Sequence, residues 1–168
     1  MPEIRVKANV RDAQKPVRKA IEGGFYDSLI VACKQGIAKT TPAVMKISLE
    51  FQITQRSHDQ DATYKGRRVF QDYLIEPLPA DPERTARETW RLKQVLDACS
   101  VPYKTEDGST IFNTDHIVGK AVKIEVKTYT PNPTEEDMKL PVEQRPKIED
   151  RNRVEKVDAL SVNEENIL

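Results

Sequence analysis

Hydrophobic and polar positions alternate most clearly within residues 44–76. Between 45 and 54 every second residue is apolar, and the residues between them are polar or charged. This period of two predicts a strand with one face in a core and the other in water. The side chains expected to point inward are Met45, Ile47, Leu49, Phe51 and Ile53. A shorter aromatic and β-branched run, 69–75, follows a polar connector, 56–63, so the two runs predict a long hairpin.

The pattern leaves open which face of the 69–75 run is buried. Phe70 and Leu74 form one apolar set, and Val69, Tyr73 and Ile75 form the other. Successive side chains of a strand point to opposite faces, so we expect one of the two aromatic residues in the core and the other outside.

The remaining strands follow from shorter runs of the same kind. One run follows a pair of glycines, one follows Gly119, and one lies within residues 152–160. Their apolar residues are Leu29, Val31 and Cys33 in the first, Val122, Ile124 and Val126 in the second, and Val154, Val157 and Leu160 in the third. The chain is therefore expected to contain five strands.

One helix is expected between the third and fourth strands. Its start carries an N-cap acceptor, a proline and a carboxylate: Asp81, Pro82 and Glu83. Its apolar stripe recurs at i, i+3, i+4 and i+7: Leu92, Val95, Leu96 and Cys99. Trp90 lies beside this stripe, and we expect it to pack against the core rather than on a ligand. Residues 103–116 are expected to form a loop.

Composition and charge suggest one domain with appendages. Of the 168 residues, 38% are hydrophobic and 32% are charged, so part of the chain is expected outside the core. The net charge is zero, but residues 1–25 hold six cations against three acids, whereas residues 131–151 hold six acids against four cations. We expect a basic N-terminal arm, 1–22, a five-stranded domain, 23–160, with a proline-rich acidic loop, 131–151, and an acidic and apolar tail, 161–168.

Several classes of protein are disfavoured by what the sequence lacks. No apolar run approaches the roughly 20 residues of a membrane span, and the charged N-terminus has no signal-peptide core. Cys33 and Cys99 have neither metal nor redox spacing, and buried reduced thiols are expected. No phosphate loop or catalytic triad is visible. We therefore expect a cytoplasmic protein without a cofactor, a metal or catalytic residues.

Cations and flat rings gather around the second half of the hairpin. Three cations and two aromatic residues fall within residues 64–70. Single-stranded nucleic acids are held by cations that contact phosphates and by rings on which bases stack. The residues expected to bind DNA are Lys34, Lys39, Lys46, Tyr64, Lys65, Arg67, Arg68, Phe70, Tyr73, Lys123, Lys127, Tyr129 and Arg153. Substituting Arg67 and Arg68 together is expected to flatten the salt dependence of binding.

The predicted element order is that of the OB-fold, a partly open five-stranded barrel with one helix between strands 3 and 4. Several segments also resemble phage-encoded single-stranded DNA-binding proteins of OB-fold type. They are residues 49–51, 64–70 (Tyr-Lys-Gly-Arg-Arg-Val-Phe), the helix at 92–98, 118–120 (Val-Gly-Lys) and Asn152. The resemblance spans roughly residues 23–158. It implies binding of single-stranded DNA during phage replication or recombination, without catalysis, in the cytoplasm of the host cell.

Two other classes of function stay open. Asp115, Glu125 and Lys127 match the spacing of metal-dependent nucleases, in which two carboxylates hold Mg²⁺ and a lysine lies near the attacking water. Alternatively, the acidic loop and tail make the chain a protein-interaction module. With either binding function, the tail is a candidate contact for replication or recombination proteins, and an exposed barrel edge is a candidate contact for a homo-oligomer.

Overall fold

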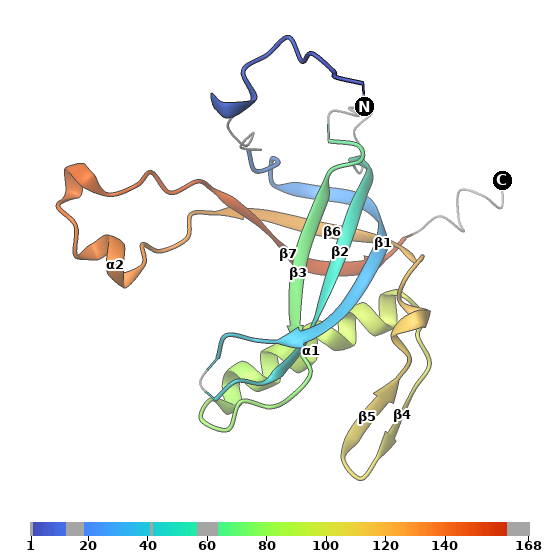
Figure 1. The fold of residues 1–168 in the computed structure, drawn as a ribbon. Helices are drawn as coiled ribbons and strands as arrows, with labels where there is room; N and C mark the ends of the chain where they lie inside the picture. The colour runs from blue at the N-terminus through green and yellow to red at the C-terminus, as the bar shows by residue number, and fades with distance from the viewer. Residues whose placement is uncertain (1, 13–18, 41, 57–63, 161–168) are drawn as a thin grey trace.

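The computed structural model describes residues 2–12, 19–40, 42–56 and 64–160. Five strands form one antiparallel sheet in the order β3-β2-β1-β6-β7 (Figure 1). Their bounds are β1 Gly24–Ile37, β2 Met45–Arg56, β3 Arg68–Leu74, β6 Ala121–Tyr129 and β7 Arg151–Ala159. The main helix is α1, Pro82–Ala98, and a separate two-stranded hairpin consists of β4, Tyr103–Glu106, and β5, Ser109–Phe112. The short elements are α2, Glu135–Met138, and 3-10 turns at Val10–Asp12, Thr114–His116 and Val142–Gln144. A mainly β fold with one principal helix is thus confirmed.

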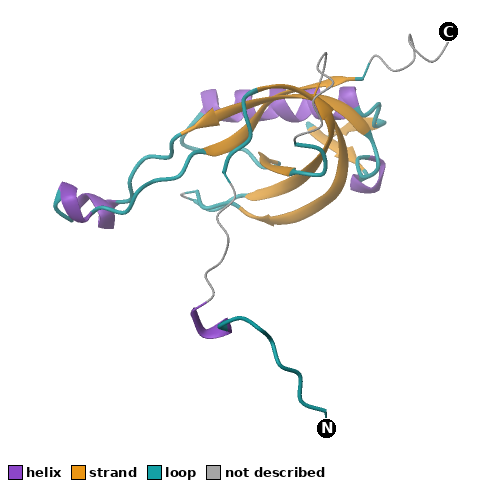
Figure 2. Cartoon of the chain, turned by 90° about the horizontal axis from the view of Figure 1, so that it is seen from above, coloured by secondary structure: helices purple, strands orange, loops and turns teal. Residues whose placement is uncertain are grey.

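The sheet is strongly curved, and α1 packs beside it (Figure 2). The two edge strands, β3 and β7, lie close to one another. The Gln71 side chain of β3 accepts a hydrogen bond from the Val154 amide of β7 at 3.0 Å. Within the described residues no backbone ladder joins these two edges. The edges are therefore linked by side chains, which leaves a gap along the line between them.

The core lies between the concave face of the sheet and α1. On β2 the predicted inner residues Ile47, Leu49, Phe51 and Ile53 are buried, whereas Met45 at the start of the strand is only partly covered. The predicted inner residues of β6 are buried as well. On α1, Asp81 caps the helix by accepting a hydrogen bond from the Arg84 amide. Its apolar stripe packs into the core, with Val95, Leu96 and Cys99 buried and Leu92 partly so.

The inner face of β1 differs from the expected one. The buried residues are Tyr26, Ser28 and Ile30, whereas Leu29 and Val31 are only partly covered. The pairing of β1 with β2 shifts between Ile30 and Ala32, which makes Val31 the extra residue of a β-bulge. Beyond the bulge the phase changes, so Cys33 lies opposite buried Leu49 and packs against the core. A bulge breaks the period of two, and a simple alternation cannot locate it.

The structure settles which face of β3 is buried. Val69 and Tyr73 point into the core, and Tyr73 is only 2% exposed. Phe70 therefore points outward and is 61% exposed. Leu74 is also buried, but in a separate small cluster with Ala38, Val44 and Leu78 at the end of the sheet.

The expectation of a loop at 103–116 is wrong, because β4 and β5 form a hairpin there and a 3-10 turn follows it. No residue of the hairpin strands is buried, so they lack the apolar alternation that reveals a strand. The sequence did contain a turn signal. Asp107 and Gly108 both have positive φ, 51° and 76°, as the central residues of a tight hairpin turn do.

Within the described residues, no helix has both the length and the apolar character needed to cross a membrane.

Candidate nucleic-acid interface

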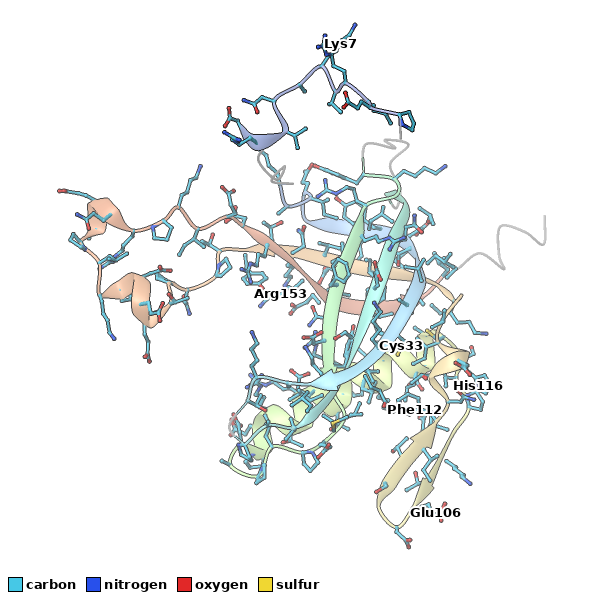
Figure 3. All side chains as sticks on the ribbon, viewed as in Figure 1. Lys7, Cys33, Glu106, Phe112, His116 and Arg153 are labelled. Atoms are coloured by element: carbon cyan, nitrogen blue, oxygen red, sulfur yellow. The ribbon has the colours of Figure 1, made fainter. Side chains whose placement is uncertain are left out.

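An open groove of about 800 Å³ lies where β3, β7 and α1 meet. Its walls are the outer side of β3, one face of α1, and the neighbouring parts of β6 and β7. Figure 3 labels Arg153 of β7 in this region. The groove follows the gap between the two sheet edges, so the fold itself creates it.

Three aromatic rings line the groove from three different elements. Phe70 on β3 is 61% exposed, Trp90 on α1 is 58% exposed and Tyr129 on β6 is 39% exposed. The expectation that Trp90 packs into the core is therefore wrong, since only the neighbouring stripe of α1 is buried. Large apolar rings exposed together in one hollow are typical of binding sites.

Two of the rings have a cation beside them. The Lys93 Nζ atom lies 5.8 Å from the centroid of the Trp90 ring, and the Arg153 Cζ atom lies 5.8 Å from the centroid of the Tyr129 ring. Cations at such distances are attracted by the electron-rich face of the ring. At Tyr129 the groove thus presents a ring beside a cation, whereas Lys93 lies outside the groove lining and pairs with Asp97 at 2.6 Å.

The charged lining is positive on balance. Five cationic side chains, Arg84, Arg87, Arg91, Arg153 and Lys156, face three carboxylates, Asp72, Glu88 and Glu155. Asp72 accepts hydrogen bonds from Lys46 and Ser48 at 2.6 Å each. Partial burial acts to raise the pKa of Asp72, but these two hydrogen bonds and the Lys46 charge outweigh burial and hold the pKa below its ordinary value. Asp72 is therefore ionised at neutral pH.

The cations of the groove differ in whether they already have a partner. Arg153 pairs with Glu155 at 3.2 Å. Among the described residues, Arg84, Arg87 and Lys156 have no ion-pair partner within 4.0 Å. These three side chains are the ones available to an incoming anion.

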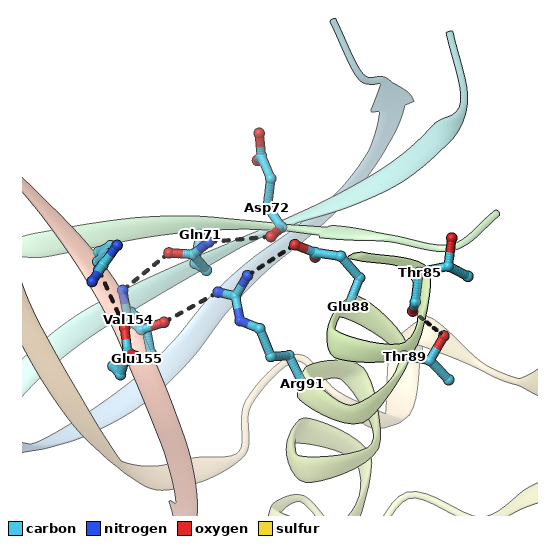
Figure 4. Close-up of polar contacts among 9 residues, drawn as sticks. Gln71, Asp72, Thr85, Glu88, Thr89, Arg91, Val154 and Glu155 are labelled. Atoms are coloured by element: carbon cyan, nitrogen blue, oxygen red, sulfur yellow. Dashed lines mark hydrogen bonds and ion pairs between the residues drawn. The ribbon is translucent and has the colours of Figure 1, made fainter. Parts of the chain in front are cut away.

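Arg91 links α1 to β7, and its charge already has a partner (Figure 4). Its guanidinium pairs with Glu88 at 3.3 Å and donates a hydrogen bond to the Val154 carbonyl at 3.2 Å. It also lies over the Tyr73 ring, 5.2 Å from the centroid. Both backbone polar groups of Val154, on the open edge of β7, are therefore bonded to side chains, one from β3 and one from α1.

A second hollow of about 490 Å³ continues from the groove and shares Asp72, Arg84 and Arg91 with it. Lys39 and Lys46 line this second hollow. The cationic lining thus extends from β7 past α1 toward the loop between β1 and β2.

The structure brings together only part of the predicted DNA-binding set. Phe70, Tyr129 and Arg153 line the groove. Lys39 and Lys46 line the adjoining hollow. Lys127 lies on β6, 3.9 Å from the carboxylate of Glu155, which lines the groove. The placement of Tyr73 is a correction, because its ring is in the core and cannot reach a ligand.

The predicted cluster at 64–68 lies outside the groove, and most of its members have internal contacts. The Tyr64 ring packs edge-on against Tyr26, with centroids 6.1 Å apart. Arg67 donates a hydrogen bond to the Lys19 carbonyl at 2.7 Å, and Arg68 pairs with Glu50 at 2.7 Å. The other three predicted cations are also outside the groove lining: Lys65 before β3, Lys34 on β1 and Lys123 on β6.

The three residues of the alternative nuclease prediction lie on two different elements. Asp115 lies in the 3-10 turn Thr114–His116, whereas Glu125 and Lys127 lie along β6. Across the described part of the chain, no three His, Cys, Asp or Glu side chains are grouped so that they could hold a metal ion. His58, Asp59 and Asp61, another group with metal-binding side chains, lie outside the described residues.

Sequence reasoning missed the helical wall of the groove. Arg84, Arg87 and Arg91 recur at i, i+3 and i+7, which places them on one face of α1. That spacing was a usable signal. Lys156 had no comparable signal, because its position depends on how β7 passes β3.

No protein-family model matches the chain, and no curated protein matches it at a significant level.

Proposed function

We propose that this protein binds single-stranded nucleic acid in the groove between β3, β7 and α1. The observation that carries the proposal is the combination of three exposed rings with Arg84, Arg87 and Lys156, which have no described ionic partner. Single strands expose both phosphates and base faces, and a groove that offers cations beside flat rings is complementary to both.

The proposed class is the OB-fold. Three strands, a helix and two strands occur in the order expected of it, if the small β4–β5 hairpin is taken as an insertion after the helix. The sheet order and the Gln71 link between β3 and β7 agree with a partly open barrel in which strands 3 and 5 meet. OB-folds bind oligonucleotides on one face of the barrel and between its loops.

Within that class, we propose a single-stranded DNA-binding protein of the kind that phages encode for replication or recombination. The support is the resemblance of segments such as 64–70 and 118–120. This function requires binding without catalysis.

The proposal is tested by titrating the full chain with labelled oligo-dT, duplex DNA and RNA of equal length at two salt concentrations, with fluorescence anisotropy as the readout. We expect the tightest binding to a single strand and weaker binding at high salt, because phosphate contacts release counterions. Equal affinity for oligo-dT and duplex DNA, or no binding to either, contradicts the proposal.

Two double variants test where the nucleic acid binds. Arg84→Ala with Arg87→Ala is expected to reduce the slope of log affinity against log salt by about 1.4, if each arginine contacts one phosphate of a single strand. Arg67→Ala with Arg68→Ala removes the same charge, but both of those side chains already have internal partners, so a smaller change is expected. A larger change in the Arg67 and Arg68 variant would place the nucleic acid on the β2–β3 hairpin instead of in the groove.

A further inference from the structure

Two segments project from the body of the protein in different directions (Figures 1 and 2). One is residues 2–12 of the N-terminal arm, and the other is the proline-rich loop between β6 and β7. The described hydrogen bonds of residues 2–12 stay within that segment, between Asn9 and Asp12 or Arg11. Arg145 supports the loop from inside by donating to the Met138 and Leu140 carbonyls.

Both segments expose apolar side chains to water. The N-terminal arm exposes Ile4, Val6 and Val10, and the loop exposes Met138, Leu140 and Val142, each by 40% or more. No residue of either segment is buried in the described structure. Single exposed apolar residues are ordinary, but three within one projecting segment make that segment a candidate surface for a partner.

The net charges of the two segments are opposite: residues 2–12 hold three cations against two acids, and residues 131–150 hold six acids against three cations. Arg5, Lys7 and Arg11 are interspersed with the apolar residues of the arm. Glu135, Glu136 and Asp137 form the turn of helix α2 in the loop, directly before Met138. Complementary charge of this kind selects a partner and fixes its orientation.

We propose that the N-terminal arm of one copy of this chain docks on the proline-rich loop of a second copy. The apolar residues of the arm cover Met138, Leu140 and Val142, and its cations face the acidic turn of α2. Two copies can make this contact reciprocally, which gives a two-fold dimer, and further copies can join head to tail, which gives a ring or a chain. The contact is independent of the proposed nucleic-acid binding.

The test is sedimentation velocity on the full chain over a concentration series, at low and high salt and without nucleic acid. We expect the mean sedimentation coefficient to rise with concentration at low salt, and to rise less at high salt because ions screen exposed charges. A monomer at every concentration and in both salts overturns the proposal.

Two charge-reversal variants identify the surfaces. One carries Arg5→Glu, Lys7→Glu and Arg11→Glu, and the other carries Glu135→Lys, Glu136→Lys and Asp137→Lys. Within either variant, both segments have the same sign, so self-association is expected to weaken by at least about tenfold. In an equimolar mixture each arm meets a loop of opposite sign, and association is expected to return. Unchanged association of either variant, or a mixture that stays monomeric, overturns the proposal.

The second reversal places lysines in the only turn of α2, where they are unfavourable near the helix N-terminus. Leu140→Ser with Val142→Ser provides an independent variant, because both residues lie outside α2. It is expected to weaken association while leaving every charge in place. Wild-type association in this variant shows that the loop does not form the contact.

Discussion

At the scale of single residues, the orientation of a few side chains decides what the groove offers. Tyr73 and Phe70 lie on one strand, but the first is buried and the second is exposed. Trp90 lies next to the buried stripe of α1, yet it faces the groove. It is the only tryptophan in the chain, so its fluorescence reports on this site alone.

Replacing Trp90 with alanine is expected to weaken binding of oligo-dT by about 1 to 3 kcal/mol, or about five- to 150-fold, because a base loses its stacking surface. In the wild type, oligo-dT is expected to quench tryptophan fluorescence. Tyr103→Ala is the matched control, since Tyr103 is 43% exposed on β4 and lies outside the groove lining. Equal losses in Trp90→Ala and Tyr103→Ala would argue against stacking in the groove.

At the scale of elements, α1 has two separate tasks. Its apolar stripe packs in the core, and its arginine face forms one wall of the groove. The edges of β3 and β7 are held in place by Gln71 and Arg91, which bond the two backbone polar groups of Val154. An edge strand otherwise leaves such groups unpaired.

Gln71→Leu keeps the size of the side chain but removes the acceptor of the Val154 amide. We expect the free energy of unfolding in urea to fall by about 1 to 3 kcal/mol, the range for leaving a partly buried polar group unpaired. Hydrogen exchange at Val154 is expected to accelerate. Gln35→Leu on β1 is the control, because the described structure assigns no side-chain hydrogen bond to Gln35. Slow exchange at Val154 in Gln71→Leu would show that the link does not hold the two edges.

At the scale of the whole molecule, the net charge bears on ligand binding, and the burial of a titratable group bears on stability. The 27 cations balance the 27 acids, so the proposed attraction of a nucleic acid would come from the local placement of charge in the groove. The core also contains a titratable group, the buried thiol of Cys99. Burial raises the pKa of the Cys99 thiol to about 11, from an ordinary value of 9.0, and the Lys120 charge offsets part of this rise.

This shift predicts a loss of stability at alkaline pH. Well below pH 9.0 the thiol is protonated in both states and contributes no pH dependence. Between pH 9 and about 11 the unfolded chain loses the proton while the folded protein keeps it, so the free energy of unfolding falls. Urea unfolding at several pH values measures this fall, and Cys99→Ala is expected to show a shallower one. Parallel curves for the variant and the wild type would show that Cys99 does not contribute.

Much of the fold could be predicted because it depends on local patterns. The inner face of β2, the cap of α1 at Asp81 and its buried stripe follow from periodicity and from hydrogen bonds between near neighbours. The β-bulge at Val31 could not be predicted in this way, since the change of phase is set by pairing with β2. The exposed hairpin β4–β5 was missed because it buries no residue.

The groove shows the same division. By itself, the sequence determined that cations and aromatic residues accompany a β-rich fold, and it identified Phe70, Tyr129 and Arg153 among them. Only the tertiary structure decided that these meet Trp90 and Arg84 from α1, that Tyr73 is buried in the core, and that Arg67 and Arg68 have partners within the chain. The physical reason is that a strand or helix pattern specifies which side of an element is apolar. Which polar sides come to share a groove depends on how distant elements pack, and that is not encoded within any one segment.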